Sequence, residues 1–292
     1  MGMRIRTNVS SLTAQRFMSQ NNKSMNDSVD KLASGYRINK SADDAAGLAI
    51  SENLRGKIRG MGVAKRNAND AISMVQVAEG TMNEMTNILI RLRELTVQAS
   101  SDTIGDKERG FLNREYTQLV DEMDRTAIVT EFNGIKLFDK ENDKTEFVIQ
   151  VGTNSEDSDT DPNTIKVDIE GLKFDSEKLG LSNEAEIGPE SGEDTGPSRE
   201  DISAKLGTLD DALGKIASER ATIGAIQNRL GSSIANLGVS IENSMVAKSR
   251  IKDVDFASET ANLAQARIMR SSNVSVLAQA NQAPEMALQL LR

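Results

Sequence analysis

The chain contains 292 residues, of which none is His, Cys or Trp and only 3% are aromatic. A Ser-His-Asp or Cys-His nucleophile and the usual structural zinc sites are excluded, because each needs His or Cys. The formal net charge is −9, from 35 basic and 44 acidic side chains, and the hydrophobic share is only 38%. With so few bulky rings, a large rounded core is not expected.

Charge and hydropathy also argue against two classes of partner. The Lys and Arg side chains of residues 1–66 are dispersed at helical spacing and not clustered with aromatic residues, so the pattern does not indicate nucleic-acid binding. Residues 1–19 lack the apolar stretch of a secretory signal, and no apolar run is long enough to cross a membrane. We expect the chain to stay in the cytoplasm or to leave by a route that reads no cleavable signal, without membrane insertion.

The first predicted helix has a weak apolar stripe in Ser- and Asn-rich surroundings. Its heptad positions are Met18, Met25, Val29 and Leu32. Such a helix buries little apolar area and is marginal alone in water. We therefore expect the amino-terminal end to be disordered until it meets a partner.

Two acidic residues precede the next predicted helix, which begins near Ala45. Asp43 and Asp44 could serve as a catalytic carboxylate pair, but capping of the helix start is the favoured interpretation. The glycines at 56, 60 and 62 do not predict a phosphate loop, since no strand precedes them and no Gly-Lys-Ser/Thr follows. No cofactor is predicted.

Two long stretches repeat apolar residues in alternating steps of three and four, which favours helices supercoiled against a partner. The core positions of the first stretch are Met61, Ala68, Val75, Met82, Leu89 and Leu92. Those of the second stretch are Leu206, Leu213, Ile223, Leu230, Ile234 and Leu237. Arg220 and Gln227 fall in the same register but are polar, which can fix the pairing at some cost in stability.

Between these stretches, residues 146–151 and 164–169 alternate apolar and polar side chains and predict a β-hairpin on the side of the helices. Residues 153–197 hold three of the four prolines and predict a loop-rich insertion. Four carboxylates, Asp157, Asp159, Asp161 and Asp168, occupy calcium-loop positions. Pro162 stands where that loop needs Gly, so a solvated acidic turn is favoured and no metal site is predicted.

The last predicted helix, about 254–283, has a stripe of mostly small residues. Its members are Val254, Ala257, Ala261, Ala264 and Ile268. Like the first helix, it is expected to be disordered alone. The predicted fold class is mainly α, with long antiparallel, coiled-coil helices from both chain ends, a small β-hairpin and discontinuous domains.

Several motifs are similar to one family. At the amino-terminal end these are residues 34–39 (SGYRIN), 43–51 (DDAAGLAIS), 66–70 (RNAND), 78–80 (AEG), 93–95 (REL) and 132–134 (FNG). At the other end they are residues 224–230 (GAIQNRL), 249–251 (SRI) and 276–282 (VLAQANQ). In this order they resemble the two signatures of bacterial flagellins, over about residues 1–152 and 200–292.

The resemblance implies a domain organisation. Residues 1–44 and 254–292 would form an inner coiled-coil domain, disordered in the monomer. Residues 45–176 and 198–253 would form an outer helical domain with the hairpin, and residues 177–197 a short acidic surface insertion without a core of its own.

The resemblance also implies a function. The chain would be a structural subunit that polymerises into the flagellar filament for swimming, secreted to the extracellular flagellum without a cleavable signal peptide. The implied partners are further copies of itself, a flagellar export chaperone, and hook-associated and cap proteins.

A further implied partner is the animal Toll-like receptor 5, because residues 89–95 are similar to the flagellin helix that this receptor binds. The matching positions are Arg91, Leu95 and Glu115, although Ile90 replaces the usual Gln. In the purely structural interpretation, Leu89 and Leu92 belong to the core stripe and Glu115 faces solvent.

A relative of the flagellins, the hook–filament junction protein, shares parts of the amino-terminal motif, but residues 43–51 and 276–282 both favour a flagellin. Two other classes of function stay open. One is a non-polymerising coiled-coil scaffold. The other is an enzyme with a carboxylate-based or Lys-based site, which no cluster of such residues supports.

Overall fold

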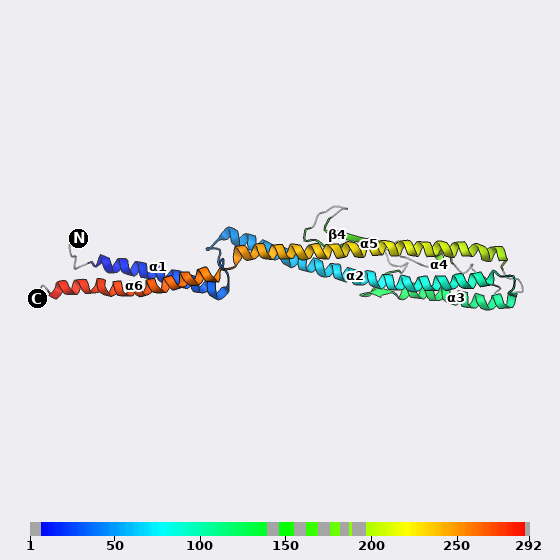
Figure 1. The fold of residues 1–292 in the computed structure, drawn as a ribbon, viewed down its shortest axis with the longest axis horizontal. Coiled ribbons are helices and arrows are strands. Elements are labelled where there is room, and N and C mark those ends of the chain that lie inside the picture. Colours follow the sequence, from blue (N-terminus) through cyan, green and yellow to red (C-terminus); the bar gives the residue numbers. More distant parts are fainter. Residues whose placement is uncertain are drawn as a thin grey trace. The chain divides into compact units, whose positions relative to one another are not determined.

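The computed structural model describes residues 7–138, 146–154, 162–168, 176–181, 187–188 and 197–289 (Figure 1). The helices are α1 (Val9–Ser34), α2 (Ala45–Ala99), α3 (Asp106–Val129), α4 (Ser176–Leu179), α5 (Arg199–Lys252) and α6 (Phe256–Gln289). The strands are β1 (Glu131–Phe132), β2 (Ile135–Lys136), β3 (Glu146–Gln150) and β4 (Thr164–Asp168). Mainly helical structure with a small antiparallel hairpin confirms the predicted fold class.

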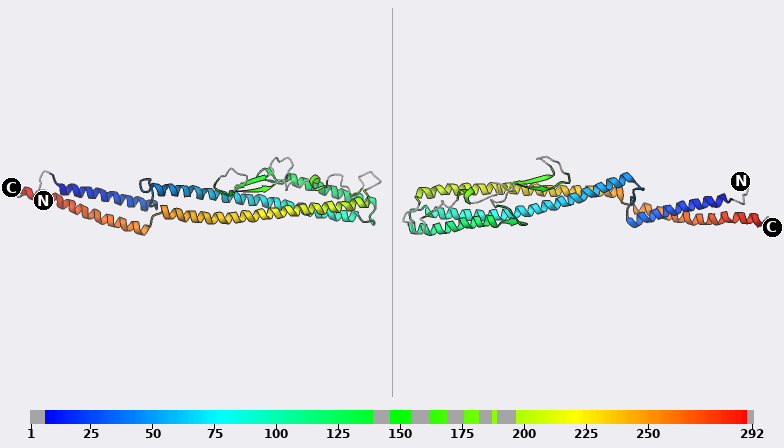
Figure 2. Two further views of the ribbon diagram at one scale, coloured as in Figure 1. Left: turned by 90° about the horizontal axis from the view of Figure 1, so that it is seen from above. Right: turned by 180° about the vertical axis from the view of Figure 1, so that it is seen from behind.

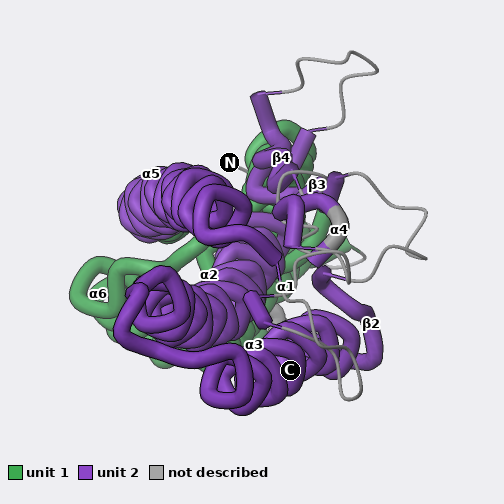
Figure 3. The backbone as a smooth tube through the Cα atoms, turned by 90° about the vertical axis from the view of Figure 1, so that its right-hand side faces the viewer, with its two compact units in different colours: residues 1–58, 242–292 green, residues 59–241 purple. Residues whose placement is uncertain are grey.

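The chain divides into two compact units, each built from separate stretches of sequence (Figure 3). Unit 1 comprises residues 1–58 and 242–292, and unit 2 comprises residues 59–241. These limits lie inside α2 and α5, whereas the resemblance implies limits at residues 44 and 254. Glu52 of α2 and Lys252 of α5 both lie in unit 1, where they contact each other.

In unit 1, α1 and α6 lie side by side and antiparallel (Figure 2). The Asn8 amide nitrogen donates to the carbonyl of Ala280 at 2.7 Å, and that of Asn21 to the carbonyl of Ala266 at 2.9 Å. Asn8 also caps α1 by accepting from the backbone N–H of Ser11. Gly35 ends α1 with φ 73°, a left-handed conformation that glycine adopts without strain.

The stripe that α6 presents to α1 differs from the one its sequence predicts. Leu263 is half-buried and Ala266 is buried, whereas Ile268 is 70% exposed. Of the other predicted positions, Ala257, Ala261 and Ala264 are exposed and Val254 is half-buried. On α6 two different sets of residues repeat at helical spacing, and the sequence alone does not tell which of them faces α1.

On α1 the predicted stripe needs one correction. Met18, Met25 and Leu32 are half-buried, but Val29 is 44% exposed and Ser28 is buried in its place. Because Ser28 is polar, a search for apolar residues at helical spacing does not find it.

The core of unit 2 is formed by α2, α3 and α5. Among the predicted core positions, those buried are Ala68, Val75, Met82, Leu89, Leu92, Ile223 and Leu230. Those only half-buried are Met61, Leu206, Leu213, Ile234 and Leu237. The polar Gln227 donates to the Glu79 carboxylate at 3.0 Å, which links α5 to α2 at a core-register position.

Helix α3 has no counterpart among the predicted helices, yet it supplies a third face of this core. Its buried residues Asn113, Tyr116, Val120, Met123 and Ala127 recur in steps of three and four. This repeat is visible in the sequence, but it begins with a polar residue and spans only a few turns.

Two hairpins complete unit 2. Strands β3 and β4 pair antiparallel with Ile149 opposite Ile165, and Ile165 and Val167 are buried. Strands β1 and β2 are joined by Asn133 and Gly134, whose φ values of 52° and 76° fit a type I′ turn. Of the four carboxylates at calcium-loop positions, which predict a solvated acidic turn, Asp157, Asp159 and Asp161 lie outside the described part of the chain, while Asp168 lies at the end of β4.

Part of the predicted surface insertion belongs to the core. Leu181 and Ile187 are fully buried in the main cluster of unit 2. The Asn113 side chain accepts from the backbone N–H of Ile187 at 3.0 Å, and Asp124 accepts from the backbone and hydroxyl of Ser176. Two polar residues of α3 therefore hold this acidic stretch against the helices at two points.

Candidate assembly and recognition surfaces

The connectors between the helices of unit 1 are joined through their backbones. The N–H of Arg37 donates to the carbonyl of Lys252 at 2.7 Å, and the N–H of Val254 donates to the carbonyl of Gly35 at 3.0 Å. Tyr36 and Asp253 form an antiparallel bridge between these contacts. The two connectors, more than 200 residues apart in sequence, therefore act as one junction.

Lys252 lies at the centre of this junction. Its ammonium group donates to the Glu52 carboxylate at 3.0 Å and lies 5.0 Å from the centroid of the Tyr36 ring. The Lys252 side chain is only 13% exposed. The hydrogen bond from Lys252 lowers the pKa of Glu52, and Arg55 and Lys248 act in the same direction. Sequence reasoning missed this cluster because its members carry no shared spacing signal.

The start of α2 is fixed by the two acidic residues that precede it. Asp44 accepts from the N–H of Gly47 at 2.9 Å, which confirms the predicted helix cap. Asp43 accepts from the backbone N–H groups of Lys40 and Asn39, and these two bonds lower the pKa of Asp43. Both carboxylates thus have structural partners.

The interface between α1 and α6 buries only small side chains. Its buried residues are small: Ser11, Ala14, Ser28 and Ala266. The Asn22 carbonyl oxygen and the Asn273 amide nitrogen are buried without a hydrogen-bond partner in the described part of the chain. An unpaired buried amide atom is destabilising, so this pair of helices holds together weakly on its own.

Unit 1 also leaves large apolar side chains in solvent. Those on α1 are Val9, Leu12, Phe17 and Val29, and those on α6 are Phe256, Ile268, Met269, Val274 and Val276. Scattered exposed apolar residues are ordinary, but here both helices of one thin pair carry them.

The residues matched to a receptor surface divide between surface and core. Arg91 donates to the Glu115 carboxylate at 2.6 Å and to Glu94 at 3.1 Å, and both Arg91 and Glu115 are about half exposed. These bonds raise the pKa of Arg91, chiefly through Glu115. Leu95 is 0% exposed in the core of unit 2, so Leu95 is not a surface contact in this structure.

Among the described residues, no helix is long and apolar enough to span a membrane. In that same part of the chain no three His, Cys, Asp or Glu side chains gather where they could hold a metal ion.

These features define a class: a mainly helical protein whose two chain ends build one weakly packed unit. The bacterial flagellin N-terminal helical region matches residues 5–143, and the bacterial flagellin C-terminal helical region matches residues 206–291. The chain belongs to the bacterial flagellin family.

Curated relatives match over nearly the whole chain. The flagellin of Bacillus subtilis is 39% identical over 305 residues, covering 99% of this chain and 100% of the relative. The flagellar filament 33 kDa core protein of Treponema phagedenis is 36% identical over 300 residues, with the same coverage. A solved structure described as a putative flagellar hook-associated protein from Vibrio parahaemolyticus has a TM-score of 0.59 at 14% identity, covering 72% of this chain and 100% of that one, and this likeness concerns the fold alone.

Proposed function

We propose that the chain is the structural subunit of a bacterial flagellar filament used for swimming, and that its terminal helices become ordered as copies assemble. Membership of the flagellin family supports the first part. The observation that carries the second is the α1–α6 pair, which buries small side chains and leaves Ile268 70% exposed. Contacts with further copies would supply the missing apolar burial that offsets the entropy of ordering.

Deletion of residues 254–292 tests the proposal. The truncated protein should remain a soluble monomer with a folded unit 2, measured by circular dichroism, and should form no filaments in negative-stain micrographs under conditions in which the full chain does. Ordinary filaments from the truncated protein would contradict it.

A point variant makes a milder test. Ile268→Glu changes an exposed side chain and should leave the monomer folded while it raises the concentration needed for polymerisation. Gln265→Glu, at another exposed position of α6, adds the same charge without removing an apolar group and should polymerise nearly as the parent does.

The proposal extends to location and partners. The filament would lie outside the cell, reached by export without a cleavable signal peptide, with an export chaperone, hook-associated proteins and cap proteins as partners. The alternatives are a hook–filament junction protein, which would add to existing ends without elongating, and a non-polymerising scaffold, which would do neither. Seeded growth of filaments from purified protein separates the three.

We also propose recognition by Toll-like receptor 5 through Arg91 and Glu115, which are about half exposed and paired with each other. Arg91→Ala should weaken the response of a receptor reporter cell line. An equal signal from parent and variant would count against this surface.

A further inference from the structure

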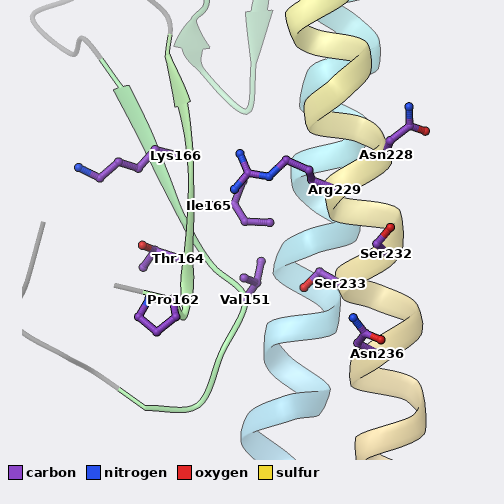
Figure 4. Close-up of a pocket in the computed structure, with 10 residues that line it drawn as sticks. All are labelled: Val151, Pro162, Thr164, Ile165, Lys166, Asn228, Arg229, Ser232, Ser233 and Asn236. Carbon is purple, nitrogen blue, oxygen red and sulfur yellow. The ribbon is translucent and has the colours of Figure 1, made fainter. Parts of the chain in front are cut away.

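A groove of about 750 Å³ lies in unit 2 between the β3–β4 hairpin and α5 (Figure 4). Val151 and Ile165 of the hairpin line it and are themselves buried, so its floor is apolar. The side of the groove along α5 is polar and is formed by Asn228, Arg229, Ser232, Ser233 and Asn236. An apolar floor with polar walls on a rigid scaffold is the usual build of a recognition site.

The polar wall has hydrogen-bonding capacity that the described part of the chain leaves unused. Figure 4 shows the Arg229 side chain extending from α5 toward Ile165 of the hairpin. Within the described part of the chain, neither Arg229 nor Ser233 nor Asn236 makes a side-chain hydrogen bond or ion pair. On the opposite wall Lys166 is already paired with Glu146 at 3.3 Å. The guanidinium of Arg229 is therefore the cation that this groove offers to a partner.

The chemistry of this wall fits a carboxylate. A guanidinium presents its N–H donors as a planar fork that matches two carboxylate oxygens, and a hydroxyl and an amide next to it can hydrogen bond to neighbouring backbone groups. The chain carries a net charge of −9, so a second copy presents an excess of carboxylates. Asp211, an exposed acidic residue of α5, illustrates the kind of group available.

Charge also restricts how two copies can meet here. In a two-fold symmetric contact, the groove of one copy would face the same groove of the other copy. This would bring two Arg229 cations together, which is unfavourable. A contact between this groove and a different, acidic surface avoids that repulsion. Such a contact is heterologous, and heterologous contacts that do not close into a ring propagate as a helical filament.

We propose that this groove binds a carboxylate-bearing surface of a second copy of the chain, with Arg229 as the anchoring residue. The inference rests on the proposed function, which it deepens by naming one of the surfaces through which subunits contact each other.

Charge reversal gives the first test. Arg229 is exposed, so Arg229→Glu should leave the circular dichroism and the unfolding midpoint of the monomer unchanged. It should raise the critical concentration for polymerisation at least about tenfold, because a carboxylate would then face a carboxylate. Arg66→Glu makes the same charge change at an exposed position of α2 and should polymerise like the parent. Normal polymerisation of Arg229→Glu would overturn the proposal.

Cross-linking gives a second test that does not depend on the effect of that variant. The chain has no Cys, so Ser233→Cys provides a single attachment point for a photoreactive label, and Ser218→Cys, at an exposed position of the same helix, is the matched control. The label at 233 should link to an Asp- or Glu-containing peptide of another copy in the polymer and not in the monomer. The label at 218 should not link to that peptide. Links from 233 that stay within the same chain would overturn the proposal.

The two proposals fail in different ways. If the parent protein and Arg66→Glu never polymerise, the proposed function is wrong and the groove proposal falls with it. If both polymerise while Arg229→Glu does so equally well, only the groove proposal is wrong.

Discussion

Tyr116 places a hydroxyl in the core of unit 2 without a hydrogen-bond partner among the described residues. Burial raises the pKa of Tyr116 to about 12. Since the unfolded chain loses this proton at lower pH than the folded chain does, the native state is favoured below about pH 10 and loses that advantage as the pH rises toward 12.

Removal of this hydroxyl should therefore stabilise the protein. We expect Tyr116→Phe to raise the free energy of unfolding by about 1 kcal/mol, because an unsatisfied buried polar group is lost. Urea unfolding at pH 8 and pH 11 measures both effects: the parent should lose more stability at pH 11 than the variant does. Both proteins should also carry Tyr36→Phe, so that Tyr116 is the one tyrosine of the reference protein and can be titrated by absorbance. A variant less stable than the parent at pH 8 would argue against an unpaired hydroxyl.

Glu52 gives a second prediction at the residue scale. Its pKa is lowered chiefly by the hydrogen bond from Lys252, so its stabilising effect exists above the ordinary pKa of a carboxyl group and disappears as the pH falls through its lowered value. Glu52→Gln should speed amide exchange of Arg37 and Val254 at pH 7, relative to the parent, and the difference should shrink in acid. Glu79→Gln, outside this junction, should leave those amides unchanged. A difference that persists undiminished at low pH would show that ionisation of Glu52 is not the cause.

At the scale of elements, two glycines of unit 2 have opposite roles. A Cβ at Gly188 would overlap the backbone carbonyl of Arg109 on α3, whereas a Cβ at Gly214 in α5 would meet open space. Gly188 is therefore required for the close approach of its segment to α3, and Gly214 only weakens its helix.

The corresponding alanine variants should shift stability in opposite directions. Gly188→Ala should lower the free energy of unfolding by about 1–3 kcal/mol through overpacking. Gly214→Ala should raise it by about 0.5–1 kcal/mol through helix propensity. Thermal unfolding of both variants beside the parent measures this. Equal effects of the two substitutions on the free energy of unfolding would mean that the segment at Gly188 can shift away from α3 without loss of stability.

The long helices and the β3–β4 hairpin were open to prediction because their patterns are local. Alternating steps of three and four place Val75, Met82 and Leu89 on one face of α2 whatever the tertiary structure is. Which face of α6 contacts α1 could not be predicted in this way. Ile268 and Leu263 belong to different stripes of α6, and only the position of α1 decides which stripe is buried. The junction around Lys252 depends on contacts between residues about 200 positions apart, for which a single sequence carries no signal.

At the scale of the whole molecule, the two units differ in how much they bury. Unit 2 has a continuous cluster with large side chains such as Met82, Leu89, Tyr116 and Met123, while the seam of unit 1 is formed by small ones. Because local stability follows buried apolar area, the two units should open independently and with different free energies.

Hydrogen exchange on the monomer measures this difference. Amides in α1 and α6 should show protection about tenfold to a hundredfold lower than buried-core amides of α2 and α3, and should gain protection on polymerisation. The hairpin β3–β4, which is part of unit 2, is an internal reference. Equal protection of terminal and central helices in the monomer would contradict a weakly held unit 1.

The pairing of α1 with α6 has a consequence for the time course of folding. The hydrogen bond from Asn8 to Ala280 joins groups 272 positions apart, so it closes a loop of nearly the entire polypeptide. Contacts of such high contact order form late. When the chain emerges from a ribosome or a narrow channel with its amino-terminal end first, α1 therefore cannot pair with α6 until the residues of α6 have emerged as well.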